Sequence, residues 1–268
     1  MAAMFAVFAC LTGATTAVTT TSSSSDKEVE KPAIRRGTSW FHRPVGATPQ
    51  AQWSYATNLY HTGHPIKAGR ALQAIVYAWP DTTNAMLAQL EYGRILMKRR
   101  KFESAIEEYT YILERYPDFL NDSADLTEEV WRNLYVAATN NDAEATYETA
   151  LKYIPARWTG TPDLRLRLAW TIEDDADYAG AGMEYLKVQS RYPETPQAEI
   201  AAFAACRCSV NGCFDDTPRD EDNFKAAYEM VVKFIDQYPD STNRVSAVAM
   251  LERVKREVES VAISDAAI

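Results

Sequence analysis

Apolar residues recur at helical spacing between residues 84 and 117, with one polar break. Arg99, Arg100 and Lys101 form that break, and the apolar residues on either side of it share one helical stripe each: Met86, Leu90, Gly93 and Met97 before it, and Phe102, Ala105, Tyr109 and Ile112 after it. Gly93 and Ala105 are small and fall where two antiparallel helices would cross closely. Pro117 ends the second helix because it has no N–H to donate. The stretch therefore predicts a helical hairpin.

The same pattern recurs five times when the closing proline is taken as the frame. An alanine stands twelve positions before each proline: Ala68, Ala105, Ala143, Ala181 and Ala227, before Pro80, Pro117, Pro155, Pro193 and Pro239. A residue able to pack in a core follows each alanine by four: Leu72, Tyr109, Tyr147, Tyr185 and Val231. The prolines are 37, 38, 38 and 46 residues apart, so the last interval contains an insertion. A small crossing residue, a packing residue one turn later and a closing proline resemble the tetratricopeptide repeat.

The repeats predict an all-α fold, a tetratricopeptide-like α-solenoid of about five helical hairpins plus a C-terminal capping helix. The expected repeat domain is 47–262, with hairpins at about 47–80, 84–117, 126–155, 162–193 and 197–239 and the capping helix at 241–262. Turns are expected near Gly63, Arg100, Asn141, Asp175 and an insertion at 211–222. Trp131 replaces glycine at the crossing position of the third hairpin, so that hairpin should be distorted.

The N-terminal residues differ from the repeats. Residues 1–14 are apolar, too short to span a bilayer, and similar to the hydrophobic region of a secretory signal without its basic start. Val7 to Cys10 resembles a lipoprotein box, so Cys10 is either the lipidated mature N-terminus or an ordinary cysteine in a signal cleaved after Ala9. Residues 15–46 are expected to form a disordered tether, or a plain tail, and an N-terminal cap in which Trp40 and Phe41 dock on the first hairpin.

Composition argues against catalysis and nucleic-acid binding. Residues 119–268 carry 15 basic and 27 acidic side chains, and the basic residues form no dense patch. The chain has three histidines, none beyond His64, and neither a glycine-rich phosphate loop nor a nucleophile elbow. We therefore predict no enzyme, no cofactor and no metal site. His61 and His64 are interpreted as part of a surface turn, and the acidic run 173–177 as a solvated turn.

Three cysteines lie close together in the insertion of the fifth repeat. Cys206, Cys208 and Cys213 leave three interpretations open: a disulfide from Cys213 to Cys206 or Cys208, buried free thiols, or a metal site without a nearby histidine. The disulfide is the interpretation that suits an exported chain.

The tetratricopeptide resemblance implies a peptide-binding groove, because the first helix of each hairpin lines the concave face in such arrays. The register of the alanine–proline frame gives inward positions that include Thr57, Leu90, Met97 and Glu128. The groove residues that we expect to bind a peptide are Trp53, Tyr60, His61, Arg94, Lys98, Arg132 and Tyr135. An extended peptide with an aromatic residue and a terminal carboxylate would suit them. The alternative is that they are ordinary residues of a helix surface.

The chain resembles the BamD family of outer-membrane assembly lipoproteins over roughly residues 47–260. The resemblance lies in the five repeats, in the lipobox-like segment with its Ser/Thr tract, and in the segments that close the repeats, such as 114–117 (ERYP) and 237–241 (QYPDS). The resemblance implies a non-catalytic scaffold anchored by lipid at the periplasmic face of the outer membrane, or soluble in the periplasm. Its implied partners are subunits of the β-barrel assembly machinery and unfolded outer-membrane proteins. The alternatives are another envelope tetratricopeptide scaffold, for envelope maintenance or division, and a cytoplasmic tetratricopeptide co-chaperone.

Overall fold

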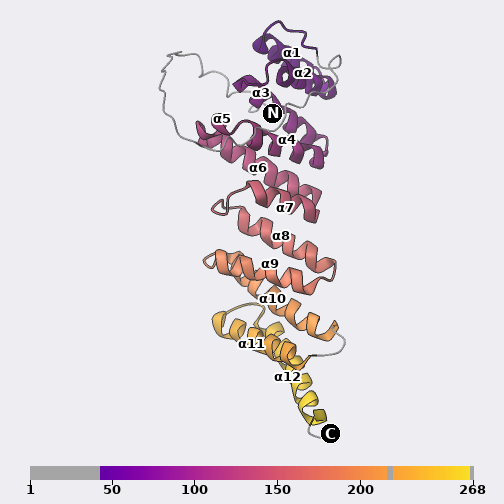
Figure 1. Ribbon diagram of the computed structural model, residues 1–268, viewed down its shortest axis with the longest axis vertical. Coiled ribbons are helices and arrows are strands. Elements are labelled where there is room, and N and C mark those ends of the chain that lie inside the picture. Colours follow the sequence, from indigo (N-terminus) through magenta and orange to yellow (C-terminus); the bar gives the residue numbers. More distant parts are fainter. Residues whose placement is uncertain (1–42, 216–219, 266–268) are drawn as a thin grey trace, which may run out of the picture. The chain divides into compact units, whose positions relative to one another are not determined.

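The computed structural model describes residues 43–215 and 220–265, and all regular secondary structure in these two ranges is helical. Twelve helices follow one another along the described residues (Figure 1). Their bounds are α1 Pro49–His61, α2 Pro65–Ala78, α3 Thr83–Lys98, α4 Phe102–Arg115, α5 Pro117–Asn121, α6 Ala124–Asn141, α7 Glu144–Tyr153, α8 Thr161–Asp174, α9 Tyr178–Arg191, α10 Pro196–Asp215, α11 Glu221–Gln237 and α12 Arg244–Asp265.

Ten of these helices form five hairpins: α1–α2, α3–α4, α6–α7, α8–α9 and α10–α11. The second helix of each hairpin packs on its own first helix and on the next first helix along the chain, so α2 contacts α3 and α4 contacts α6. The last second helix, α11, packs instead against α12. This is the arrangement of a tetratricopeptide-like solenoid with a capping helix, and it confirms the fold class predicted from the sequence.

The closing prolines fix where the second helices end. α2, α4, α7, α9 and α11 each end two residues before the proline of their frame. A proline disfavours the helical conformation of the residue that precedes it, which explains this common end. The packing residue of every frame is buried, at 5% exposure for Leu72 and 0% for the other four: Tyr109, Tyr147, Tyr185 and Val231. The sequence frame therefore places the second helices and their core side chains.

The third hairpin departs from this register by one helical turn. Three other hairpins turn through a left-handed residue five positions before the frame alanine, at Gly63, Arg100 and Ala176. In the third hairpin that residue is Asp142, directly before Ala143. This position confirms the turn expected near Asn141, and it leaves α7 only 10 residues long. The expected crossing at Ala143 is wrong, because this alanine is half-buried at the N-terminus of α7.

The interface between α6 and α7 is the smallest of the five within-hairpin interfaces. Trp131 is half-buried against the neighbouring core rather than at a tight crossing. The distortion expected for this hairpin is present, and it takes the form of a displaced turn.

The insertion is also shorter than expected, because α10 continues through Asn211 and Gly212 to Asp215. All three cysteines of the insertion consequently lie on one helix and are buried. Residues five and seven apart on a helix are separated by about 7.5 and 10 Å along its axis, beyond the roughly 7 Å between Cα atoms that a disulfide spans. The predicted disulfide is wrong, and the cysteines are thiols.

Cys206 and Cys208 serve different parts of the core, since residues two apart point to opposite sides of a helix. Cys206 packs with residues of α11 and α12, and Cys208 with residues of α8 and α9. Burial raises the pKa of each thiol to about 12. Two buried, weakly acidic thiols on the two sides of α10 indicate a packing role.

Some predictions made from the sequence lie outside the described residues. They are the signal-like segment, Cys10, the tether and the docking of Trp40 and Phe41. α5, between the second and third hairpins, was not expected from the sequence pattern. Among the described helices, none has the length and apolar character needed to cross a membrane.

Candidate peptide-binding face

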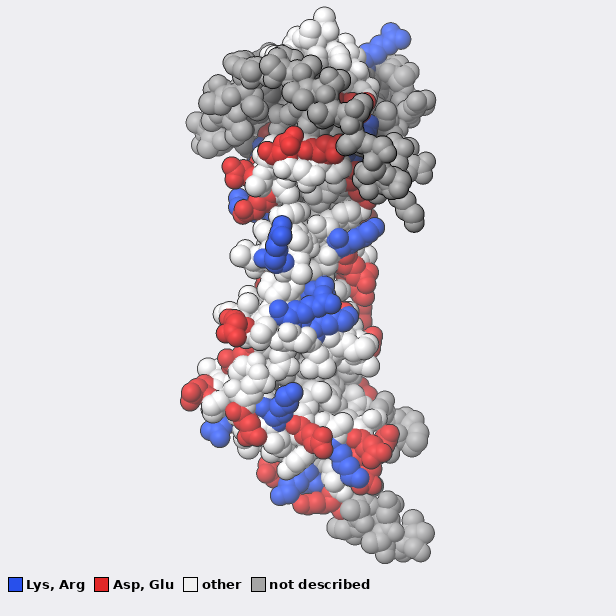
Figure 2. All heavy atoms as spheres, turned by 60° about the vertical axis from the view of Figure 1, so that its left-hand side comes forward, with Lys and Arg blue, Asp and Glu red and all other residues white. Residues whose placement is uncertain are grey.

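The first helices of the five hairpins, α1, α3, α6, α8 and α10, lie side by side in chain order, since each contacts the next. We call the surface that they form the first-helix face. Polar side chains connect the helices at each of its four junctions. Figure 2, a view of one side of the molecule, shows lysine and arginine in small separate groups near acidic side chains, without a continuous basic band on that side.

The junction of α1 and α3 brings together two residues of the predicted groove. Lys98 Nζ donates a hydrogen bond of 2.6 Å to the hydroxyl of Tyr60, and it lies 5.1 Å from the centroid of the Tyr60 ring. The exposed His61 ring meets the same tyrosine edge-on, at 6.1 Å between centroids. This end of the face is both aromatic and basic. The α3–α4 turn adds three more exposed basic residues, which are Arg99, Arg100 and Lys101.

The junction of α3 and α6 is an ion-pair network. Arg94 bonds to Glu91 on its own helix and to Glu129 on α6. Burial raises the pKa of Glu91, although the charge of Arg94 opposes the shift. One turn along α6 from Glu128, Arg132 pairs with that carboxylate at 2.8 Å. Both arginines expected to hold a ligand carboxylate are thus paired with carboxylates of the protein itself.

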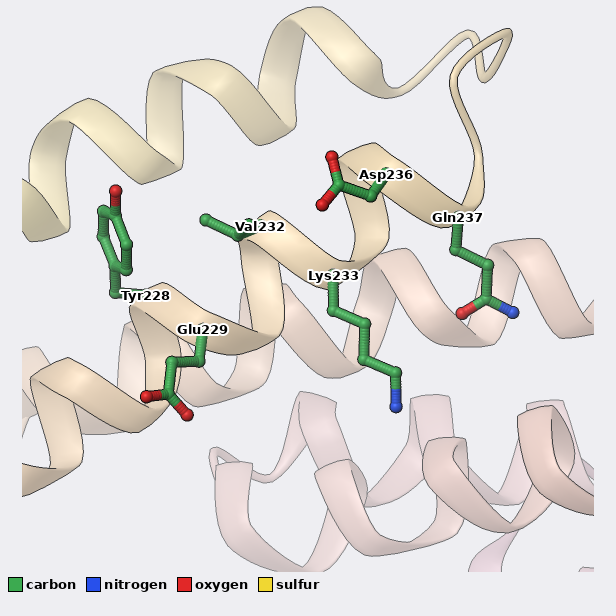
Figure 3. A pocket seen from close by; sticks show the side chains of 6 residues that line it. All are labelled: Tyr228, Glu229, Val232, Lys233, Asp236 and Gln237. Carbon is green, nitrogen blue, oxygen red and sulfur yellow. The ribbon is translucent and has the colours of Figure 1, made fainter.

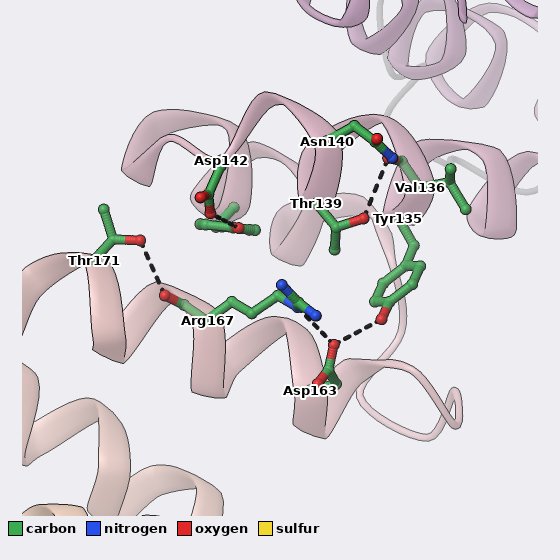
Figure 4. A network of polar contacts seen from close by, with 9 residues as sticks. Tyr135, Val136, Thr139, Asn140, Asp142, Asp163, Arg167 and Thr171 are labelled. Atoms are coloured by element: carbon green, nitrogen blue, oxygen red, sulfur yellow. Dashed lines mark hydrogen bonds and ion pairs between the residues drawn. The ribbon is translucent and has the colours of Figure 1, made fainter.

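The junction of α6 and α8 centres on Asp163 (Figure 4). Its Oδ2 atom accepts hydrogen bonds from the Tyr135 hydroxyl at 2.6 Å and from Arg167 Nε at 2.8 Å. Burial raises the pKa of Tyr135, and the bond to Asp163 adds to that shift. The Tyr135 ring also packs edge-on against Trp158 at 5.5 Å. Tyr135 therefore holds two hairpins together.

The junction of α8 and α10 centres on Glu173. Arg207 donates to both of its oxygens, from Nε at 2.7 Å and from Nη2 at 2.6 Å. The Tyr185 hydroxyl adds a third bond at 2.6 Å. Burial alone would raise the pKa of Glu173, but the bonds from Arg207 and Tyr185 outweigh it, so the pKa lies below its usual value. Beside this network the Trp170 side chain is 38% exposed.

The structure distributes the predicted groove residues along the face rather than in one cluster. Trp53 is 8% exposed and belongs to the core, so it offers little surface to a ligand. Tyr60, His61 and Lys98 lie together, whereas Arg94, Arg132 and Tyr135 are engaged at later junctions. Leu90 is also buried. The part of the predicted groove with exposed basic and aromatic groups is therefore its α1–α3 end.

The prediction missed the residues of the fourth hairpin, although the signal for them is in the sequence. The expected groove positions lie at fixed distances before the alanine of each hairpin. Before Ala68 they are Trp53, Thr57, Tyr60 and His61. The same distances before Ala181 give Leu166, Trp170, Glu173 and Asp174. The pair of Asp163 and Arg167 is indicated by their i,i+4 spacing on α8. The bonds that Tyr135 and Arg207 make across hairpins could not be found from the sequence, because they depend on how the helices pack.

A hollow lies on α11, outside the first-helix face. Tyr228, Glu229, Val232, Lys233, Asp236 and Gln237 line a volume of about 510 Å³ (Figure 3). All six side chains come from one helix, so no second element closes around a ligand there.

The chemistry of the first-helix face is suited to non-covalent binding. The polar groups at its junctions are hydrogen-bonded to each other, which fixes the spacing of the helices. Within the described part of the chain, no cluster of His, Cys, Asp or Glu could hold a metal ion.

No protein-family model and no curated protein matches the sequence. Several solved structures of tetratricopeptide proteins are similar at low identity. One, a tetratricopeptide repeat protein from Parabacteroides merdae, is 14% identical with a TM-score of 0.37, over 81% of this chain and 79% of that one. Another, YrrB, described as a TPR protein with an unusual peptide-binding site, is 13% identical with a TM-score of 0.37, over 75% of this chain and 92% of its own.

A third similar structure is TTC0263, a thermophilic TPR protein of Thermus thermophilus, which is 15% identical with a TM-score of 0.31, over 76% of this chain and 99% of its own. Because these scores are low, the assignment of a tetratricopeptide-like fold rests on the helical hairpins of the chain itself.

Proposed function

We propose that this chain is a non-catalytic scaffold that binds an extended segment of another protein along the first-helix face. The observation that carries the proposal is the row of five adjacent first helices, joined by polar contacts at every junction. Such a row offers a long surface of fixed spacing on which an extended chain can make many small contacts. The exposed aromatic and basic groups at its α1–α3 end suit an aromatic residue and a carboxylate of the bound segment.

The finer proposal is a BamD-like role in outer-membrane protein assembly. In this role the N-terminal hairpins bind unfolded barrel proteins and the C-terminal hairpins bind subunits of the assembly machinery. Cys10 would anchor the chain by lipid at the periplasmic face of the outer membrane. The support is the resemblance in sequence: the lipobox-like segment, the Ser/Thr tract and the closing phrases of the repeats.

Fluorescence polarisation with a labelled peptide tests the binding proposal. The probe ends in phenylalanine with a free carboxylate, and the same peptide with an amidated end is the comparison. We expect the free form to bind more tightly, and the double variant Lys98→Glu, Arg99→Glu to weaken it by about tenfold or more, because charge-assisted hydrogen bonds are lost.

The matched control is the double variant Lys152→Glu, Arg157→Glu, which makes the same charge change at exposed residues of α7 and of the loop between α7 and α8. It should bind the peptide almost as the wild type does. Equal affinity for the free and amidated peptides, or equal effects of the two double variants, would contradict carboxylate binding at the α1–α3 end.

Palmitate labelling with membrane fractionation tests the proposed anchor. We expect labelled protein in the outer-membrane fraction, and loss of the label from the Cys10→Ala variant. Unlabelled protein that stays soluble would contradict the lipid anchor. A pull-down from solubilised membranes that recovers no subunit of a barrel-assembly complex would contradict the BamD-like role.

A further inference from the structure

Besides the aromatic and basic groups at its α1–α3 end, the first-helix face has a pocket between α8 and α10. It has a volume of about 610 Å³, and its lining includes Trp170, Glu173, Asp174, Arg207 and Asn211. α10 forms one wall of the pocket because it is 20 residues long and continues past Arg207 to Asp215. The pocket therefore depends on the unexpected length of α10.

Trp170 gives the pocket an accessible aromatic surface. The side chain is 38% exposed, although a tryptophan gains much by burial. Tryptophan also binds cations over its ring face better than the other aromatic residues do. An exposed tryptophan in a hollow is thus suited to hold a flat apolar group or a cation.

The charges around the pocket select between these two ligands. Arg207 is the basic residue in the lining, and its guanidinium is already held by both oxygens of Glu173. Asp174 follows at the end of α8 and is exposed, as are Asp175 and Asp177 in the α8–α9 turn. Because the Glu173 and Arg207 charges compensate each other, the surplus charge at this edge is negative. A cationic side chain is complementary to it, whereas an acidic ligand would be repelled.

We infer that the α8–α10 pocket binds an arginine or lysine side chain of a partner protein, stacked on Trp170 and facing the carboxylate of Asp174. The Asn211 side chain, which lines the same pocket, can donate and accept hydrogen bonds with the bound segment. The inference rests on the proposed function only in taking a protein as the partner. It assigns the fourth and fifth hairpins a basic segment, in contrast to the carboxylate proposed for the α1–α3 end.

Nuclear magnetic resonance of protein labelled with ¹⁵N at tryptophan tests this pocket. The chain has six tryptophans, and the Trp170 indole signal is identified by its loss from the Trp170→Phe variant. The probe is a short acetylated and amidated peptide with one arginine between Gly-Ser spacers. Citrulline, which has the shape of arginine without its charge, and glutamate replace the arginine in two control peptides.

We expect the arginine peptide to shift the Trp170 signal in a saturable way, with affinity about tenfold above that of the citrulline peptide. The variant Asp174→Asn should weaken the arginine peptide several-fold. Glu148→Gln, which removes an exposed carboxylate from α7, should leave the affinity unchanged. Both substitutions are at exposed positions, so neither should unfold the chain.

The inference is overturned if the Trp170 signal does not move at about 10 mM arginine peptide, or if the citrulline or glutamate peptide moves it equally. Equal effects of Asp174→Asn and Glu148→Gln would also overturn it. The readout is local to α8 and α10, so its failure is distinguishable from failure of carboxylate-peptide binding at the α1–α3 end, which uses another probe and other residues.

Discussion

The second and third hairpins share one sequence frame but pack differently. In the second hairpin Ala105 is fully buried, and a Cβ atom on Gly93 would come within 2.5 Å of the Tyr109 ring. In the third hairpin the turn comes one helical turn later, Ala143 is half-buried, and α6 makes a larger interface with the preceding α4 than with its own partner α7. An alanine twelve residues before a proline therefore does not by itself create a tight crossing.

The buried surfaces of the two first helices also differ. α3 buries polar and charged side chains, among them Gln89, which bonds to the buried Glu108 of α4, and Glu91. The buried residues of α6 are all apolar: Val130, Leu134, Ala137 and Ala138. Directed polar contacts therefore add to the packing of the second hairpin, whereas the buried residues of α6 offer no such contacts. Asp142 is a residue type that tolerates the left-handed turn, and its carboxylate accepts a bond from the Tyr147 hydroxyl.

The largest expected effect comes from one substitution made in both hairpins. Ala105→Trp should lower the free energy of unfolding by about 3 kcal/mol or more, because the fully buried site cannot admit the ring. Ala143→Trp should lower it by less than about 1 kcal/mol, since that site is half-buried. Urea denaturation of both variants checks the difference. Equal losses would mean that the two alanines occupy equivalent crossings.

A smaller loss is expected from Gly93→Ala, at about 1–3 kcal/mol, because Tyr109 is fully buried and its ring has no room to move away. The matched control is Gly182→Ala in α9, where the nearest atom to the new Cβ would be 3.8 Å away. That variant should be as stable as the wild type or gain up to about 1 kcal/mol in helix propensity. Thermal unfolding measures both, and a stable Gly93→Ala variant would refute the tight crossing.

Replacement by glycine should change the stability of the chain differently at the left-handed turn residues of the second and third hairpins, Arg100 and Asp142. Arg100→Gly should stabilise the chain by about 1 kcal/mol, because it relieves the steric strain of a side chain at φ 57°. Asp142→Gly relieves similar strain at φ 51° but loses the bond from Tyr147, so we expect no net gain. The urea denaturation midpoints of the two variants measure this difference. Equal gains in stability would mean that the bond from Tyr147 to Asp142 does not contribute to the displaced turn.

The smallest expected effect is the pH dependence contributed by Glu91. Burial raises its pKa above 4.5, so the folded chain takes up a proton at a higher pH than the unfolded chain does. Folding should therefore become more favourable as the pH falls through the folded pKa towards 4.5. The Glu91→Gln variant should lack this gain, with a difference below about 1 kcal/mol. Parallel stability curves of wild type and variant between pH 7 and 4.5 would contradict the assignment.

The parts of the fold that depend on local sequence could be predicted, and the parts that depend on contacts between hairpins could not. Prolines end helices locally, so all five second helices end where the frame places them. The turn after α6 also lies where it was expected, next to Asn141. The length of α10 and the loose crossing at Ala143 depend on tertiary packing, which no spacing in the sequence encodes.

The candidate site shows the same division. The frame places Tyr60 and Lys98 on adjacent helices, and it would have placed Trp170. It could not reveal that Glu129 of α6 pairs with Arg94 of α3, because that contact joins two hairpins. The pair of Glu128 and Arg132 could have been read from their i,i+4 spacing on α6.

The central claim is that the first-helix face, and not the second helices, binds an unfolded polypeptide. Site-directed photo-crosslinking tests it most directly, with benzoylphenylalanine at Tyr60 and Val136 on first helices and at Ile66 and Met183 on second helices. Val136, Ile66 and Met183 are exposed at 37, 50 and 61%, so access does not favour the first-helix face. The probe is a urea-unfolded outer-membrane barrel protein, diluted into the reaction. The account predicts adducts from Tyr60 and Val136 and almost none from Ile66 and Met183; equal yields from all four positions would contradict it.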